Sequence, residues 1–199
     1  QKNKKRARKR ASQDDGFLNY SFFSNISDQS LFGTIDIFSI LEKKEGNGMG
    51  QVSIVRVKEN IKESLNHSMQ LIGGISKFIQ HGDRILLKPN LNGWEGTTNR
   101  TMVEALIQLL LDYQVRSIVI GESTFGDAQM TKFCFQKTGF QDLAKKYHLP
   151  LINFNQSETV SVPVSDPLIL KNILIAKEYF EADVIINLPV MKVHYATGV

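Results

Sequence analysis

The chain has 199 residues, a hydrophobic content of 42% and a formal net charge of +4, which together predict one domain of roughly 150 residues with a real core. No apolar run approaches the roughly 20 residues that a membrane-spanning helix needs, so no membrane span is expected. The single cysteine, Cys134, excludes an internal disulfide and a self-contained zinc or iron–sulfur site, and it favours a cytoplasmic protein.

The positive charge is concentrated at the start of the chain. Residues 1–10 contain seven basic side chains, so the remainder carries a net charge of 4 − 7 = −3. A block of like charges repels itself and favours a solvated tail. The alternative is an electrostatic arm for nucleic acid or acidic lipid, of which nucleic acid is the less favoured partner. Because residues 42–50 are charged and then glycine-rich, we predict a poorly ordered extension over 1–48 and an α/β domain over 49–199.

Regular hydrophobic patterns begin just after residue 50. Residues 52–57 predict a first strand, and apolar residues three and four positions apart predict a helix over 61–79. A second strand is expected over 84–87, ended by Lys-Pro-Asn. Thr101 with Glu104 forms a capping-box pattern that predicts the start of a helix ending near residue 113.

The second half of the chain continues to alternate between the two kinds of pattern. Strands are predicted over 117–120, 150–154, 159–164, 168–175 and 184–187, and helices over 130–137, 139–147 and 177–181. Pro163 places its strand at an exposed edge, and Cys134 between two phenylalanines is interpreted as a small core residue. The alternation predicts an α/β fold: a mostly parallel sheet with helices on both faces, as in the three-layer Rossmann-like folds.

Polar side chains follow four of these strands at the point where each strand ends; the strand over 150–154 ends with Asn153 and Asn155. Because the carboxyl ends of parallel strands meet at one edge, where ligands of open α/β sheets bind, we expect them to gather there. The candidate ligand-binding residues at these ends are Lys88, Asn90, Glu122, Ser123 and Asn187, and the candidate catalytic residues are Lys192 and His194. Taken singly, each is as consistent with a solvated lysine, a turn-forming asparagine or a structural histidine. Only the set indicates a binding site.

The loop before the helix at residue 101 offers an anion-binding alternative. Thr97, Thr98 and Asn99 open onto a helix start, where free backbone N–H groups favour phosphate or carboxylate. An ordinary capped helix is the competing interpretation. The loop has neither the ending of a P-loop nor the GxGxxG fingerprint, so neither ATP nor NAD is indicated.

The order of these motifs resembles a known family. ILLKPNLNG, TTNRTMVEALIQLL, IVIGEST and ADVIINLPVMKVH follow one another as in the family catalogued as domain of unknown function 362. The resemblance covers about residues 52–199. It implies a bacterial or archaeal protein, and it suggests association with a ferredoxin-like iron–sulfur domain or protein, which some members carry. Family members continue past the position of Val199, so the resemblance implies a domain that is incomplete at the C-terminus.

A more distant likeness concerns residues 190–194 only. VMKVH at 190–194 is similar in outline to the nickel-pincer lactate racemase family. This likeness implies that His194 acts as a general base or lies near a metal, and that Lys192 holds a carboxylate or phosphate. Histidine suits proton transfer because its unperturbed pKa lies near neutrality.

Three functions remain open at this level. The first is binding of an anionic small molecule or organic cofactor at the carboxyl edge of the sheet, as part of an enzyme. The second is an accessory redox module beside an iron–sulfur protein, with no chemistry of its own. The third is binding of nucleic acid or an anionic membrane surface through residues 1–10. The sequence itself names no cofactor, substrate or reaction.

Overall fold

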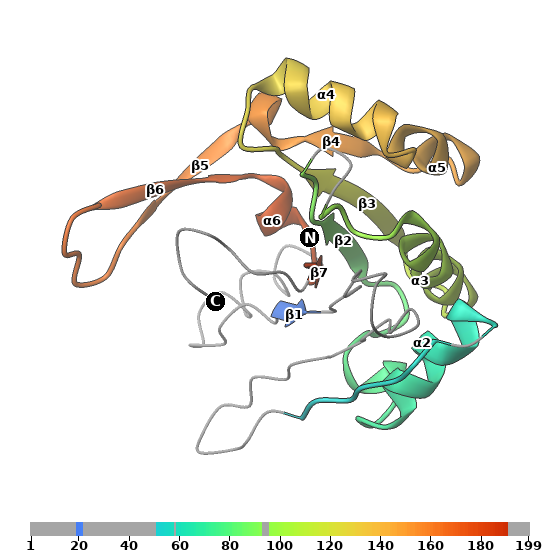
Figure 1. Ribbon diagram of the computed structural model, residues 1–199. Coiled ribbons are helices and arrows are strands. Elements are labelled where there is room, and N and C mark those ends of the chain that lie inside the picture. Colours follow the sequence, from blue (N-terminus) through green and yellow to red (C-terminus); the bar gives the residue numbers. More distant parts are fainter. Residues whose placement is uncertain (1–18, 22–50, 58, 93–95, 191–199) are drawn as a thin grey trace, which may run out of the picture.

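The computed structural model describes residues 19–21, 51–57, 59–92 and 96–190, and its centre is a five-stranded sheet (Figure 1). The strands follow the order β1-β7-β2-β3-β4, and each neighbouring pair runs parallel. Their bounds are β1 Asn19–Ser21, β2 Arg84–Pro89, β3 Ser117–Glu122, β4 Leu151–Asn153 and β7 Val184–Leu188. The predicted α/β class with a parallel sheet is confirmed.

Helices cover the sheet unequally. The bounds of the helices are α2 Ile61–Gln70, α3 Arg100–Asp112, α4 Ala128–Lys137, α5 Phe140–Lys146 and α6 Glu178–Glu181, with 3₁₀ turns η1 Ile75–Lys77 and η2 Phe154–Gln156. The first four pack into one core with alternate residues of β2, such as Ile85 and Leu87. The short α6 contacts β2 as well. It belongs to the connection from β4 to β7, and the right-handed crossover rule places this connection on the opposite face.

The main core lies between the sheet and helices α2 to α5. Leu87, Val103, Ile107 and Phe140 have no measurable exposure to solvent. Cys134 is 2% exposed and belongs to the same cluster, so its interpretation as a core residue is confirmed. Strands β2 and β7 are buried along nearly their whole length, which is typical of central strands in parallel sheets.

Strands β5 Thr159–Pro163 and β6 Asn172–Ala176 form a separate antiparallel hairpin. Figure 1 shows this hairpin extending away from the main sheet. Both strands were expected from the sequence, and within the described residues they pair only with each other. The residues between them expose Leu168, Ile169 and Leu170 at 101%, 88% and 64%.

The predicted strand over 52–57 is wrong, because the described residues 51–57 form no strand. Val52 and Ile54 are exposed, whereas Ser53 between them is buried. The Ser53 hydroxyl donates to the Ser68 carbonyl oxygen at 2.8 Å, so this segment lies against α2 through its polar side chain. Alternation alone does not show which of the two sets of side chains turns inward.

The helix predicted over 61–79 is shorter than expected. Helix α2 ends at Gln70, and Gly73 and Gly74 follow with φ angles of +111° and +84°. These angles lie in the region that favours glycine and cannot continue a right-handed helix. Ile72 and Ile79 are nevertheless buried in the core. The sequence therefore identified the buried apolar residues correctly but not the end of the helix.

No helix within the described ranges has both the length and the apolar character that crossing a bilayer requires. The domain boundary predicted near Met49 stays a prediction, because residues 22–50 lie outside the described residues.

Candidate functional site

The parallel sheet brings the carboxyl ends of β2, β3 and β7 side by side. In the β2–β7 pairing, Lys88 lies opposite Asn187, and Pro89 lies opposite Leu188. Beyond the strands, the Asn90 N–H donates to the Leu188 carbonyl oxygen at 3.2 Å. Two of the predicted polar strand ends therefore meet at one position of the sheet.

A lysine–carboxylate pair links the ends of β2 and β3. The Lys88 Nζ lies 2.5 Å from the Glu122 Oε2, and the Ser123 N–H donates to the Glu122 Oε1 at 2.8 Å. The Glu122 side chain is 8% exposed, and that of Lys88 is 30% exposed. Both carboxylate oxygens thus have a partner, while the ammonium is the member of the pair that reaches solvent. Glu122 holds the end of Lys88 at the edge of the sheet.

This pair lines a cavity of about 280 Å³ between the loops that follow β2 and β3. Its lining residues are Lys88, Asn90, Leu91, Asn92, Glu122, Ser123 and Phe125. Four of the predicted ligand-binding residues are among them, and their role in binding stays a prediction. The volume is close to the lower limit of about 300 Å³ for small-molecule pockets, so it suits a small metabolite or one end of a larger molecule.

Tyr179 on α6 lies close enough to Glu122 for the two groups to interact electrostatically. Burial, and then the Glu122 charge, raise the pKa of Tyr179 to about 12. The Tyr179 phenol therefore stays protonated near neutral pH and serves neither as a base nor as an anion. Its ring contacts that of Phe154, with centroids 5.3 Å apart.

Gly121 makes this aromatic packing against the sheet end feasible. A Cβ at position 121 would lie 2.5 Å from the Phe154 ring, closer than any real contact. The glycine just before Glu122 therefore lets Phe154, at the start of η2, lie directly on the end of β3.

The loop between β2 and α3 is held together by its own polar groups. Thr98 is 2% exposed; its hydroxyl donates to the Leu188 carbonyl oxygen and accepts from the Asn90 N–H. The Asn90 side-chain amide donates to the Gly96 carbonyl oxygen, and the Thr97 hydroxyl accepts from the Asn92 N–H at 3.1 Å. These residues shape the loop that borders the cavity, so Thr98 has little capacity left for a ligand.

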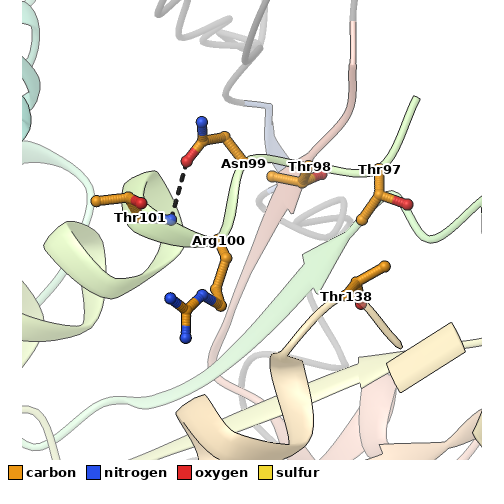
Figure 2. Close-up of a pocket in the computed structure, with 6 residues that line it drawn as sticks. All are labelled: Thr97, Thr98, Asn99, Arg100, Thr101 and Thr138. Atoms are coloured by element: carbon orange, nitrogen blue, oxygen red, sulfur yellow. Dashed lines mark hydrogen bonds between the residues drawn. The ribbon is translucent and has the colours of Figure 1, made fainter. Parts of the chain in front are cut away.

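A second cavity of about 320 Å³ lies at the start of α3, lined by Thr97, Thr98, Asn99, Arg100, Thr101 and Thr138. Figure 2 shows Asn99 and Arg100 pointing to opposite sides of the chain there. The Asn99 side chain accepts from the N–H groups of Thr101 and Met102. Because the N-cap already occupies these two N–H groups, the ordinary capped helix describes this end better than an anion site does.

The predicted capping box at Thr101 and Glu104 is wrong. Asn99 is the N-cap, which puts Thr101 inside the first turn. Glu104 instead pairs with Lys146 on α5 at 2.5 Å and accepts from the Tyr147 hydroxyl at 3.0 Å. These contacts lower the pKa of Glu104, chiefly through the hydrogen bond from Lys146, while burial opposes the shift.

The remaining predicted positions fall into three groups. Asn187 lies beside Lys88 in the sheet but lines neither cavity. Lys192 and His194, the candidate catalytic residues, lie outside the described residues. After β4, the Asn153 and Asn155 amides donate to the Ala128 and Gly126 carbonyl oxygens, so these residues hold the loop after β3.

Three cavity residues and one neighbour were not predicted from the sequence. Leu91 and Asn92 come from the loop after β2, Phe125 from the loop after β3, and Tyr179 from α6. Phe125 stands beside a glycine in a polar loop after a buried strand, which is a signal that could have identified it. Tyr179 gave no such signal, because only the crossover brings it to Glu122. Among the described residues, no three His, Cys, Asp or Glu side chains are grouped as metal ligands.

The fold and the cavity define an α/β domain with a polar pocket at the carboxyl edge of a parallel sheet. The family described as Domain of unknown function (DUF362) matches residues 85–199, which include every strand of the main sheet except β1 and part of β2. The chain belongs to this family, as the order of its motifs predicted. No solved structure matches the chain.

A curated relative is the Thylakoid-associated protein sll1697 of Synechocystis sp. (strain ATCC 27184 / PCC 6803 / Kazusa). It is 29% identical to the chain over 136 residues, which amount to 66% of this chain and 40% of the relative. The match thus spans well under half of the relative's length. The comparisons do not show the predicted likeness to the lactate racemase family.

Proposed function

We propose that this domain binds an anionic small molecule in the cavity between the loops after β2 and β3. The observation that carries the proposal is the Lys88–Glu122 pair, whose carboxylate is buried and whose ammonium is the more exposed partner in a cavity of about 280 Å³. A lysine has three N–H donors, and Glu122 occupies one of them. Two donors therefore remain for a carboxylate or phosphate oxygen.

The charge balance of the cavity supports a small anion over a highly charged one. Glu122 offsets the charge of Lys88, so the pair attracts a ligand through directed hydrogen bonds more than through a net field. Asn92 and Ser123 line the same cavity and carry an amide and a hydroxyl. Such groups fix the orientation of a ligand in a mostly preformed pocket. Lys192 and His194 remain the predicted catalytic residues of this site, in keeping with a role in an enzyme.

The other two functions have less support. Residues 1–10, on which binding to nucleic acid or membranes would depend, lie outside the described residues. The relative is named thylakoid-associated, which is compatible with a membrane surface but does not point to a residue of this chain. Nothing in the described part of the chain favours an iron–sulfur partner over a small ligand.

The test is a thermal-shift screen of carboxylate- and phosphate-bearing metabolites, followed by calorimetric titration of each hit. We expect Lys88→Met to weaken binding of the hits about tenfold or more, because a charge-assisted hydrogen bond is lost. Lys62→Met is the matched control. Lys62 also pairs with a carboxylate, Asp112, at 2.7 Å and is 36% exposed, but this pair joins α2 to α3 and does not line the cavity. Equal affinities of the two variants for every hit would contradict the proposal.

A further inference from the structure

We infer that the ligand of this cavity carries an aromatic ring beside its anionic group, and that Phe125 is the stacking surface for that ring. The inference rests on the proposed function and adds the chemical class of the ligand. Phe125 is 108% exposed and lines the cavity together with Lys88 and Glu122. A single exposed apolar side chain is ordinary on a protein surface. Its position at the cavity and the way its backbone is held are what distinguish it.

The backbone on both sides of Phe125 is anchored. The Thr124 N–H donates to the buried Thr131 hydroxyl at 3.0 Å, and the Gly126 carbonyl oxygen accepts from the Asn155 amide at 3.2 Å. Asp127 then caps α4 by accepting from the Met130 N–H at 2.8 Å. The loop therefore presents Phe125 in a defined place, although its side chain is fully exposed among the residues that the structure describes.

Gly126 also fixes how closely this loop approaches α4. A Cβ at position 126 would lie 2.9 Å from the Met130 Cβ, so a larger residue would push the loop away from the helix. The close approach holds the residue before it, Phe125, at the cavity. The anchored backbone confines the ordering that accompanies ligand binding to the Phe125 side chain, which favours a binding role for this residue.

The cavity offers different chemistry at its different sides. Lys88 and Glu122 provide the polar side, Leu91, which is 5% exposed, provides apolar surface, and Phe125 provides an aromatic face. A purely inorganic anion would use only the first of these. A ring with an attached carboxylate or phosphate would use all three, since aromatic pairs stabilise one another beyond the area they bury.

The experiment measures the affinities of four probes by calorimetry: 1-naphthyl phosphate, 1-naphthoate, cyclohexyl phosphate and inorganic phosphate. For wild type, we expect at least one of the two naphthyl probes to bind more tightly than both cyclohexyl phosphate and inorganic phosphate. Phe125→Ala should weaken the naphthyl probe about tenfold and leave inorganic phosphate unchanged, while Phe125→Trp should retain the affinity. The two naphthyl probes distinguish phosphate from carboxylate as the anionic group. Exposed Phe133, at 48%, supplies the matched control Phe133→Ala.

The failures of the two proposals are distinguishable. If Lys88→Met weakens the probes but Phe125→Ala weakens none, the aromatic inference is wrong and the proposed function stands. If Phe125→Ala lowered the affinities for naphthyl and cyclohexyl phosphate equally, the aromatic inference would also be overturned. The Phe125 ring would then contact an aliphatic ring as well as an aromatic one. A loss with inorganic phosphate in Phe125→Ala would show that Phe125 only shapes the pocket. Absence of binding by wild type to all four probes at millimolar concentration would overturn both proposals.

Discussion

Glu122 illustrates how a single buried charge is accommodated at the end of a strand. A buried carboxylate is costly unless each of its oxygens has a partner. Lys88 and the Ser123 N–H provide these partners. Glu122 looks least suited to a site for an anionic ligand. It is nevertheless the residue that positions the Lys88 ammonium group.

A second carboxylate, Glu104, makes the stability of the domain depend on pH. Its pKa is lowered in the folded state, so its contribution is present above its unfolded pKa and is lost as the pH falls through the folded pKa. We expect Glu104→Gln to lower the Tm at pH 7 by roughly 2 °C and to lower it less at acid pH. Thermal unfolding followed by circular dichroism between pH 3 and 7 measures this difference.

The control for this prediction is Glu59→Gln, since Glu59 is exposed and forms no ion pair in the described part of the chain. A Tm difference between Glu104→Gln and wild type that stays constant over the whole pH range would contradict the assignment to the Lys146 pair.

At the residue scale, the sequence predicted which polar residues lie together better than it predicted their contacts. Lys88, Asn90, Glu122 and Ser123 line one cavity because residues that end parallel strands are neighbours whatever their separation along the chain. The role of Thr98 was not predictable. Its hydroxyl partner, the Leu188 carbonyl oxygen, lies 90 residues away and belongs to the backbone, which has no sequence signature.

At the scale of elements, the β5–β6 hairpin differs from the rest of the domain. It contacts the sheet mainly through its connection to α6, and its connecting segment exposes Leu168, Ile169 and Leu170. Apolar side chains that stay exposed after folding contribute little to the free energy of unfolding. The stability of the described part of the chain therefore does not explain why these three positions carry apolar side chains.

We expect the triple change Leu168→Ser, Ile169→Ser and Leu170→Ser to alter the free energy of unfolding by no more than about 0.5 kcal/mol. The matched control is Leu106→Ala in α3, which is 1% exposed and should cost about 2–5 kcal/mol. Urea unfolding measures both. A loss above about 1 kcal/mol in the triple variant would show that the segment packs against another part of the protein.

Helices and strands were predictable where the period of apolar residues was long or the strand was wholly buried. Helix α3 and strands β2, β3 and β7 belong to this group. The errors fall where a local contact overrides the pattern: Ser53 turns residues 51–57 toward α2, Gly73 and Gly74 end α2 early, and Asn99 displaces Thr101 as the N-cap. Each depends on a side-chain hydrogen bond or a backbone angle that hydrophobicity does not encode.

At the scale of the whole molecule, strand order decides where a ligand can bind. The chain proceeds from β2 through β3 to β4 in one direction, and then returns to place β7 on the other side of β2. In open α/β sheets, ligands bind outside the carboxyl ends of the strands near such a reversal, and here the cavity lies one strand from it, between the loops after β2 and β3. The alternation of strands and helices predicted a parallel sheet, but the order β7-β2-β3-β4 came only from the structure.

The central claim is that the carboxyl edge of this sheet is the binding edge. The most direct measurement is a map of backbone amide chemical shifts in the ¹⁵N-labelled chain titrated with 1-naphthyl phosphate. We predict that the amides of Asn90, Ser123 and Phe125 shift most, while those of Gly82 and Arg116, at the opposite edge, stay in place. Largest shifts at Gly82 and Arg116, or equal shifts at both edges, would contradict the claim.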